Sequence, residues 1–303
     1  MKGTVVVRAP AKINLFLRVL AGRPDGYHEL ETLFQAISLG DDVEVSVGDA
    51  GQGEGDGITL DVVGPDLGPK SENLAVLAAA RFCDVAGVDR SVHIRLVKRT
   101  PIGAGFGGGS SDGAAVLRCL AALAGRSDPT LLHTIASELG SDVPFFLGPS
   151  PLALGRGRGE RLTPLRPLPP AQLVLALPPV QVATGDAYRA LAELRGAAPP
   201  ALARDVDTTT LGWDEIEALA ENDFEPLIAE RHDEVRRSLE GLRAQGARWT
   251  LLSGSGAATF GVFANRSAAE VAAGRLEDEL GWPFIVSITS TELPALRTAV
   301  HGG

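Results

Sequence analysis

The stretch Pro101-Ile102-Gly103-Ala104-Gly105-Phe106-Gly107-Gly108-Gly109-Ser110-Ser111-Asp112 lies between two segments of regular hydrophobic patterning. Residues 92–97 alternate apolar and polar side chains, which predicts a half-buried strand, and residues 114–123 predict a buried helix. Backbone this rich in glycine can turn its N–H groups inward and let a phosphate approach where a Cβ would clash. A helix that begins near Ser111 adds the positive end of its dipole. The stretch therefore predicts a phosphate-binding loop between a strand and a helix.

Other glycine motifs also fit parts of this stretch. A G-x-G-x-x-G pattern begins at Gly103, but a dinucleotide site also requires an acidic residue at a strand end about 20 residues further on. That distance falls in 121–126, at the end of a predicted helix, which argues against a dinucleotide. A G-x-S-x-G pattern begins at Gly109, so a serine hydrolase that uses Ser111 stays an alternative. No Gly-Lys-Ser/Thr follows the glycines, which excludes a Walker A loop.

Composition limits the class of protein. The chain has 303 residues with 36 Gly and 20 Pro, 45% hydrophobic and 22% charged residues, which excludes a disordered chain. The glycines follow no G-X-Y period, which excludes collagen. The net charge of −10 disfavours nucleic acids and anionic membranes as partners. Because no apolar run approaches the ~18 residues of a membrane span, we expect a cytoplasmic protein with no membrane partner.

The two cysteines, Cys83 and Cys119, fall in apolar helical stretches, and we expect both to be buried free thiols. No metal-ligand spacing joins them to the five histidines, so we expect no zinc site.

The order of predicted elements indicates an α+β protein with two domains. A Leu168-Pro169-Pro170 segment is the best boundary, which divides the chain into 1–168 and 169–303. The pattern predicts a glycine-rich acidic loop at 49–57 and irregular structure over 148–170. Strands are predicted at 4–7, 13–20, 43–47, 58–63, 92–97, 173–177 and 259–263, with a break at 9–11. Helices are predicted at 71–87 with Ser71 as cap, 114–123, 129–140 after Asp128 and Pro129, 186–194, 213–220, 233–245 and 267–281 with Ser267 as cap.

Two further clusters suggest chemistry. Lys12 and Asn14 are two residues apart on a predicted strand, which places both side chains on one face. Asp142 stands before the apolar run Pro144-Phe145-Phe146, beside hydrophobic surface. On local evidence alone, a solvated strand residue is the favoured interpretation of Lys12, and a turn or capping residue is the favoured interpretation of Asp142.

The glycine loop resembles the ATP loop of the GHMP kinases, P-x-G-x-G-L-G-(G/S)-(G/S)-S. The blocks 9–17 and 23–30 strengthen the resemblance, and the blocks 139–145, 155–160 and 253–257 follow in the expected order. One departure is Phe106, where the family usually has Leu. We expect altered packing there, with ATP binding retained.

The resemblance implies an α+β fold of two domains with the site in the cleft between them. The N-terminal domain is then a ribosomal-protein-S5-like ATP-binding domain, and the C-terminal domain is ferredoxin-like α/β. The Asp25-Gly26-Tyr27-His28 block is similar to that of family members that phosphorylate the 2-hydroxyl of a cytidine-diphosphate-linked methylerythritol, in the non-mevalonate route to isoprenoids. Another GHMP small-molecule kinase, of homoserine or mevalonate type, stays an alternative. A catalytically silent nucleotide-binding module is another.

The resemblance also implies cofactors, partners and site residues. ATP and Mg²⁺ are the expected cofactors, with Ser110 or Ser111 helping to hold the metal and its other ligands left open. The expected partner is a small-molecule cytidine diphosphate substrate, with the chain as a monomer or weak homodimer. By this resemblance the catalytic residues are Lys12 and Asp142, with Asp142 as the base and Lys12 neutralising charge. The implied substrate-binding residues are Asn14, Tyr27, His28, Thr184 and Tyr188, and the implied ATP-binding residues are Asn73, Lys98, Pro101, Ile102, Gly103, Ala104, Gly105, Phe106, Gly107, Gly108, Gly109, Ser110 and Ser111.

Overall fold

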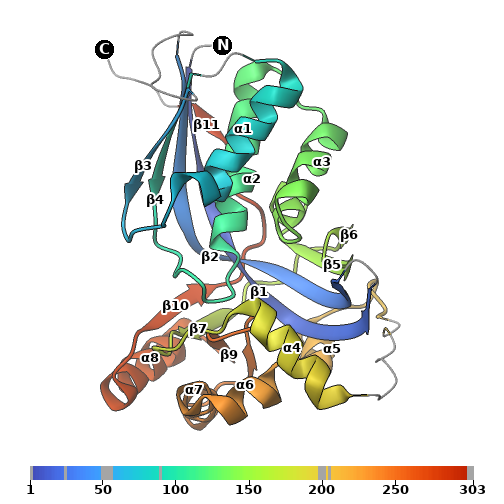
Figure 1. The fold of residues 1–303 in the computed structure, drawn as a ribbon. Helices are drawn as coiled ribbons and strands as arrows, with labels where there is room; N and C mark the ends of the chain where they lie inside the picture. The colour runs from blue at the N-terminus through green and yellow to red at the C-terminus, as the bar shows by residue number, and fades with distance from the viewer. Residues whose placement is uncertain are drawn as a thin grey trace.

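Two long antiparallel strands, β1 (Gly3–Gly22) and β2 (His28–Val47), form the frame of the molecule. The structure is a computed structural model that describes residues 3–23, 26–48, 57–88, 91–196, 203 and 206–298. Figure 1 shows both strands running from the upper half of the molecule into its lower half. The loop predicted at 49–57 lies outside the described residues except for Gly57.

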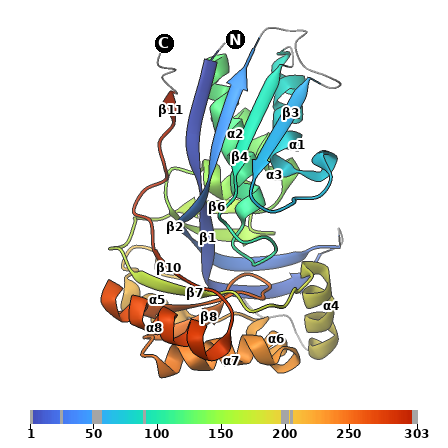
Figure 2. The same ribbon diagram turned by 90° about the vertical axis from the view of Figure 1, so that its left-hand side faces the viewer.

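The upper half is a mixed sheet covered by helices. Its strand order is β11-β1-β2-β4-β3, and β5 pairs with the lower part of β2 and with β6. The helices lie together on one side of the sheet in Figures 1 and 2. The elements are β3 (Ile58–Val63), β4 (Val92–Val97), β5 (Leu152–Gly157), β6 (Arg161–Pro164), β11 (Arg297–Thr298), α1 (Leu74–Ala86), α2 (Gly108–Ala124) and α3 (Pro129–Leu139), with short 3-10 turns η1 (Lys70–Glu72) and η2 (Val143–Leu147).

The lower half is an antiparallel sheet of order β10-β7-β9-β8. Its strands and the helices between them follow the β-α-β-β-α-β pattern of ferredoxin-like domains. The predicted α+β, two-domain GHMP kinase fold class is confirmed. The elements are β7 (Gln172–Ala176), α4 (Thr184–Arg195), α5 (Trp213–Leu219), α6 (Glu225–Arg231), α7 (Asp233–Ala244), β8 (Trp249–Leu252), β9 (Thr259–Phe263), α8 (Arg266–Leu280) and β10 (Phe284–Ile288).

The predicted break at 9–11 is wrong, because β1 continues through Pro10. The pairing with β2 shifts register between Pro10 and Lys12 instead of ending. Opposite Pro10 stands Gly40, where a Cβ would lie 2.4 Å from the carbonyl oxygen of Ala9. The absence of a side chain at Gly40 therefore lets the two strands cross closely enough to stay paired.

Several helix starts differ from the prediction. Asn73, not Ser71, caps α1, and Asn265, not Ser267, caps α8, each through its side-chain oxygen. The helix after the glycine loop begins at Gly108, three residues before the expected start near Ser111 and six before the apolar run at 114–123. Glycine disfavours a helix by about 1 kcal/mol per residue, so packing in the core overrides the local preference here. The cap at Asp128 is confirmed.

The segment 148–170, predicted to be irregular, contains the β5–β6 hairpin. The sequence pattern also did not predict residues 28–42 of β2 or the elements α6, β8, β10 and β11. The second sheet begins at Gln172, close to the predicted boundary, yet β11 returns to pair with β1. The division at residue 168 therefore stays a prediction.

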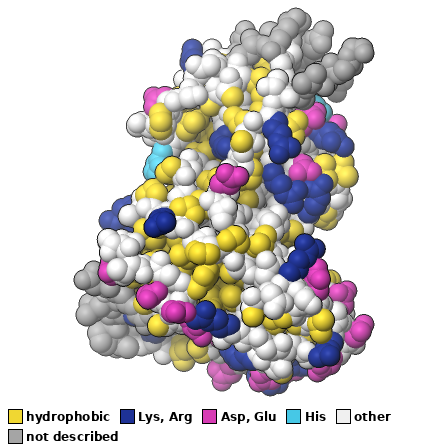
Figure 3. All heavy atoms as spheres, turned by 180° about the vertical axis from the view of Figure 1, so that it is seen from behind, with side chains coloured by type: hydrophobic (Ala, Val, Ile, Leu, Met, Phe, Trp, Pro, Cys, Tyr) yellow, Lys and Arg dark blue, Asp and Glu magenta, His cyan; other side chains and the backbone are white. Residues whose placement is uncertain are grey.

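Cys83 and Cys119 are both buried and free, as expected. Figure 3 shows basic and acidic side chains interspersed over the back of the molecule. Within the described ranges, no helix combines the length and apolar character that crossing a bilayer requires.

Candidate active site

Lys12 and Asn14 share one face of β1, and they interact directly. The Lys12 ammonium donates to Asn14 Oδ1 at 2.8 Å and to the Gly105 carbonyl oxygen at 2.9 Å. The Lys12 side chain is only 4% exposed, so it is not a solvated strand residue. Asn14 in turn donates from Nδ2 to Thr32 Oγ1 at 2.8 Å, which fixes its orientation. Position and orientation of both side chains are therefore set by β1, β2 and the glycine loop.

Asp142 faces Lys12 from another element. Its Oδ2 lies 3.5 Å from Lys12 Nζ, and its side chain is 32% exposed. Asp142 stands immediately before η2, but its carboxylate makes no capping hydrogen bond there. The local alternative of a capping aspartate therefore does not describe this side chain. The carboxylate is available to a ligand.

The glycine loop packs against both halves of the molecule. The backbone N–H of Lys12 donates to the Phe106 carbonyl at 2.9 Å, and Phe106 itself is buried in the core. Gly105 has a φ of +80°, and a Cβ there would lie 2.2 Å from the Ser253 carbonyl oxygen. The Ser253 hydroxyl donates to the Gly105 carbonyl at 3.2 Å. Glycine is thus required at 105 both by conformation and by space.

A cavity of about 350 Å³, here called the loop cavity, lies against the glycine loop. The first N–H groups of α2, from Gly108 onward, lack intrahelical acceptors and favour an anion. Ser111 is the one predicted ATP-binding residue outside the lining, and it is buried. The lining consists of Leu67, Glu72, Asn73, Leu74, Lys98, Thr100, Pro101, Ile102, Gly103, Ala104, Gly105, Phe106, Gly107, Gly108, Gly109, Ser110 and Asp112.

Lys98 is held in a buried cluster of charges beside this cavity. Its ammonium lies 2.5 Å from Asp41 Oδ2 and 2.7 Å from Asp112 Oδ2. Asp41 also accepts the backbone N–H groups of Arg99 and Thr100 through Oδ1. Burial, opposed by Lys98, raises the pKa of Asp112 to about 7. The side chains of Asp41 and Asp112 together fix the position of the Lys98 ammonium beside the glycine loop.

The donor set beside the loop fits a small hard cation. Three buried oxygens find no hydrogen-bond partner: Thr100 Oγ1, Ser111 Oγ and Asp112 Oδ1. Hydroxyl and carboxylate oxygens are the ligands that Mg²⁺ prefers. Within the described ranges, no three His, Cys, Asp or Glu side chains gather as a metal cage. The residues therefore fit a metal that takes most of its ligands from phosphates and water.

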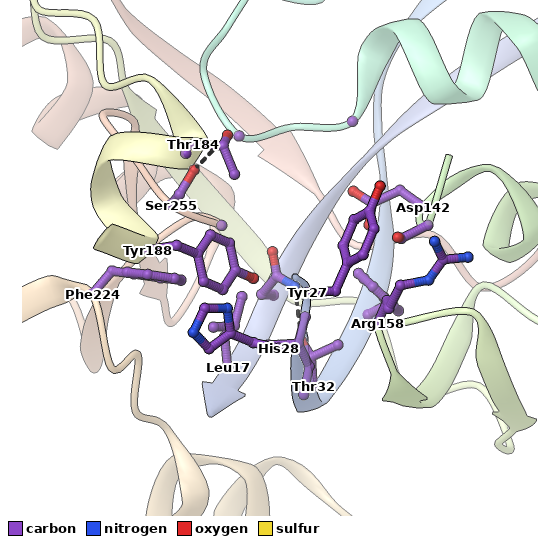
Figure 4. A pocket seen from close by; sticks show the side chains of 18 of the residues that line it. Leu17, Tyr27, His28, Thr32, Asp142, Arg158, Thr184, Tyr188, Phe224 and Ser255 are labelled. Carbon is purple, nitrogen blue, oxygen red and sulfur yellow. Dashed lines mark hydrogen bonds between the residues drawn. The ribbon is translucent and has the colours of Figure 1, made fainter. Parts of the chain in front are cut away.

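A second cavity of about 560 Å³, here called the substrate cavity, lies on the other side of the loop. Figure 4 shows its labelled side chains pointing toward a common space. It shares Gly105 and Gly107 with the loop cavity. Its lining consists of Lys12, Asn14, Leu17, Gly26, Tyr27, His28, Leu30, Thr32, Phe34, Gly105, Gly107, Ser141, Asp142, Arg158, Thr184, Gly185, Tyr188, Arg189, Ala192, Phe224, Gly254 and Ser255.

One end of the substrate cavity is aromatic. The rings of His28 and Tyr188 stack at 4.9 Å with an angle of 25°, and Phe224 meets Tyr188 edge-on. Burial, with a smaller effect of Arg195, lowers the pKa of His28, so the ring is neutral at pH 7. Burial and the charge of Asp142 raise the pKa of Tyr188, which keeps its hydroxyl protonated. This end can stack and hydrogen-bond a planar base.

The structure thus brings all seven predicted catalytic and substrate residues to one cavity. Thr184, at the start of α4, shares a hydrogen bond of 3.0 Å with Ser255, which sequence reasoning did not single out. Arg158 and Asp112 were also missed as site residues. The 155–160 and 253–257 blocks already contained Arg158 and Ser255, but nothing local indicated which of their residues face the cavity.

Comparisons with known proteins agree with this geometry. Residues 73–148 match the model of the GHMP kinases N terminal domain, and 209–281 match GHMP kinases C terminal. A 4-diphosphocytidyl-2-C-methyl-D-erythritol kinase of Anaeromyxobacter dehalogenans (strain 2CP-C) is 47% identical over 278 residues, 89% of this chain and 84% of that protein. A crystal structure of 4-(cytidine 5'-diphospho)-2C-methyl-D-erythritol kinase matches with a TM-score of 0.75 and 38% identity, covering 94% of this chain and 99% of that one.

A homoserine kinase from Cytophaga hutchinsonii matches with a TM-score of 0.71 over 99% of this chain and 98% of that one, but with 18% identity, so that likeness concerns the fold alone. The fold, the glycine loop and the paired cavities define a small-molecule kinase of the GHMP class, which uses ATP. Within that class, the chain belongs to the family of 4-diphosphocytidyl-2-C-methyl-D-erythritol kinases.

Proposed function

We propose that this chain transfers the γ-phosphoryl group of ATP to the 2-hydroxyl of 4-diphosphocytidyl-2-C-methyl-D-erythritol, giving the 2-phosphate and ADP in isoprenoid biosynthesis. The observation that carries the proposal is the contact between Lys12 and Asp142 where the two cavities meet at Gly105. The pair therefore lies between the loop cavity, which suits phosphates, and the substrate cavity, which suits an alcohol that carries a nucleobase.

Asp142 acts as the general base in this account. Its carboxylate takes the proton of the substrate hydroxyl as that oxygen bonds to the γ-phosphorus, and the bond from phosphorus to the ADP oxygen breaks. A positioned base of this kind contributes typically about 10²–10⁴-fold to a rate. Its oxygen must lie within hydrogen-bond reach of the hydroxyl, and its partly exposed position in the lining of the substrate cavity allows that.

Lys12 orients the reacting groups and neutralises charge. Its ammonium contacts Asp142 while it is anchored on Asn14 and the Gly105 carbonyl. Phosphoryl transfer depends mainly on positioning and on stabilising the charge of the transferred oxygens. A buried cation that is already oriented supplies both without reorganisation during the reaction.

The loop cavity is the proposed ATP site. The N-terminus of α2 and the glycine backbone hold the phosphates, and Asn73 and Lys98 lie along the same cavity. Mg²⁺, when bound, neutralises charge on the phosphates, and Ser110 or Ser111 with Asp112 would help to hold it. Asn73 already uses its Oδ1 to cap α1, so its amide N–H groups are what it can offer a ligand.

The proposed cytidine site is formed by the aromatic end of the substrate cavity and by Tyr27, which lies across the cavity from His28 and Tyr188. Tyr27 and Tyr188 stack on the cytosine ring, and the neutral His28 reads its edge through hydrogen bonds. Asn14 and Thr184 contact the diphosphate and erythritol region. The proposal also includes a cytoplasmic location, no nucleic-acid or membrane partner, and a monomeric or weakly dimeric state.

The test is ADP release with ATP and Mg²⁺ in the presence of the cytidyl-erythritol substrate, homoserine or mevalonate in turn. We expect turnover with the first alone. Turnover with homoserine or mevalonate at a comparable kcat/KM would reject the assignment in favour of another GHMP kinase activity. ATP binding without turnover of any of the three would favour a silent nucleotide-binding module.

A further inference from the structure

Arg158 stands at the turn of the β5–β6 hairpin, between two glycines with unusual backbone angles. Gly157 has a φ of +75° and Gly159 a φ of +111°, a region that side chains rarely adopt. The backbone N–H of Arg158 donates to Glu160 Oε2 at 2.6 Å. A Cβ at Gly157 would lie 2.8 Å from both carboxylate oxygens of Glu160. The turn is therefore shaped to hold Arg158 in one place.

The side chain of Arg158 reaches into the substrate cavity and lies on an aromatic ring. Its Cζ is 4.8 Å from the centroid of the Tyr27 ring. Figure 4 shows Arg158 and Tyr27 on the side of the cavity that holds Asp142, with His28 and Tyr188 across from them. A guanidinium on a ring face is attracted to it and keeps its N–H edge free. The contact thus orients Arg158 without neutralising its charge.

The neighbouring arginines of the hairpin are already paired. Arg156 forms an ion pair with the buried Glu31 at 3.1 Å, and Arg161 forms one with Glu29. Among the described residues, no carboxylate forms an ion pair with Arg158. Of the three, Arg158 is the one that lines the cavity. Its charge is therefore available to a ligand.

The other cationic groups of the cavity lining are committed or neutral. Lys12 pairs with Asp142. Arg189 is 78% exposed and pairs with an aspartate of its own helix. The lowered pKa of His28 leaves that ring uncharged at neutral pH. In a chain of net charge −10, a local cation favours the binding of a dianionic ligand, and among the described residues Arg158 is the lining cation without an ion-pair partner.

We propose that Arg158 is a specificity-determining residue, whose guanidinium, held on the ring of Tyr27, binds the diphosphate of the nucleotide-linked substrate. The proposal rests on the function proposed above, because it concerns the substrate of that same site. The diphosphate joins the erythritol to the cytidine, and Arg158 lies on the Asp142 side of the cavity, across from His28 and Tyr188, so its charge borders the space that this linkage must cross. A planar guanidinium can donate two parallel hydrogen bonds to phosphate oxygens.

The test uses the whole chain and measures the binding of cytidine 5′-diphosphate and of cytidine by calorimetry, together with turnover of the full substrate. The variants are Arg158→Met, which keeps the apolar stem, Arg158→Gln as a second neutral variant, and Arg158→Lys. Arg161→Met is the matched control, since it removes a cation from the same hairpin outside the cavity. Thermal unfolding checks that each variant is folded.

We expect the neutral variants to bind cytidine 5′-diphosphate about tenfold or more weakly than the wild type, with cytidine binding unchanged, as loss of a charge-assisted hydrogen bond requires. Arg158→Lys should recover part of the loss, and Arg161→Met should behave as the wild type. If the neutral variants bind cytidine 5′-diphosphate as tightly as the wild type, and the wild type turns the substrate over normally, the role of Arg158 is overturned and the proposed function stands. A wild type that neither binds cytidine 5′-diphosphate nor turns the substrate over would overturn the proposed function, and this inference with it.

Discussion

The ammonium of Lys12 lies 3.5 Å from the carboxylate of Asp142, across the junction of β1 with the segment that precedes η2. The two residues are 130 positions apart in the chain, and the glycine loop between them in sequence also lies beside them in space. Lys12 is buried while Asp142 opens into the substrate cavity. The pair therefore combines a rigid cation with an accessible base.

Substitution of Lys12 by Met should lower kcat by about 100-fold or more, because removal of one preorganised charge donor has that magnitude in other enzymes. The methionine keeps the apolar stem, so the packing near Phe34 is retained. The dissociation constant for ATP should change only a few-fold. Steady-state kinetics and nucleotide binding together check this expectation, and a kcat within a few-fold of the wild type would contradict it.

The glycine loop offers a matched pair of substitutions. Gly105→Ala should raise the KM for ATP about tenfold or more, since the new Cβ would lie 2.2 Å from the Ser253 carbonyl and the loop must move. Gly103→Ala also places alanine at positive φ, but no heavy atom lies within 4 Å of its Cβ. It should cost only about 1–2 kcal/mol of backbone strain. Equal KM values for ATP in the two variants would show that the close approach at Gly105 is unimportant.

Tyr27→Ala should weaken binding of the cytidine substrate by about tenfold, because stacking on a base is worth about 1–3 kcal/mol. Tyr27 is 53% exposed, so the melting temperature should hardly change. Tyr27→Phe keeps the ring and serves as the control. Substrate KM values for both variants, measured at saturating ATP, test the role. If alanine and phenylalanine behave alike, Tyr27 does not stack on the base.

The carboxyl of Glu225 offers a test of pH dependence away from the site. Burial raises its pKa, opposed by the backbone N–H of Leu252 and by Arg243. A carboxyl with a raised pKa binds its proton more tightly when folded, so its contribution to stability is present below the unfolded pKa of about 4.3 and is lost as pH rises through the folded pKa. Relative to the wild type, Glu225→Gln should therefore gain stability as pH increases above about 4. Chemical denaturation of both proteins from pH 4 to pH 8 measures the free energy of unfolding of the variant minus that of the wild type. A fall of this signed difference with rising pH would contradict the expectation.

Short-range patterns in the sequence were sufficient to predict the position of the glycine loop and the shared face of Lys12 and Asn14 on their strand. The alternation around Lys12 and Asn14 predicted a shared face, and the hydrogen bond between them confirms it. The loop lies between β4 and α2, as the glycine pattern indicated. These features depend on residues close together in the chain, where spacing alone determines geometry.

Contacts between distant segments were beyond sequence reasoning. The resemblance implies an ATP-binding role for Lys98, but its two carboxylate partners, Asp41 and Asp112, become evident only when the strands are paired. The early start of α2 at Gly108 runs against glycine's helix preference and depends on packing. Arg158 meets Tyr27 only because the β5–β6 hairpin folds onto the lower part of β2.

The most direct test of the central claim, that Asp142 beside Lys12 is the base for phosphoryl transfer, is the single-turnover rate of Asp142→Asn with bound ATP, Mg²⁺ and cytidyl-erythritol substrate. Asparagine keeps the size of the side chain and removes its ability to accept a proton as a base. The account predicts a rate lower by about 10²–10⁴-fold, with ATP affinity within a few-fold of the wild type. A single-turnover rate close to that of the wild type would contradict it.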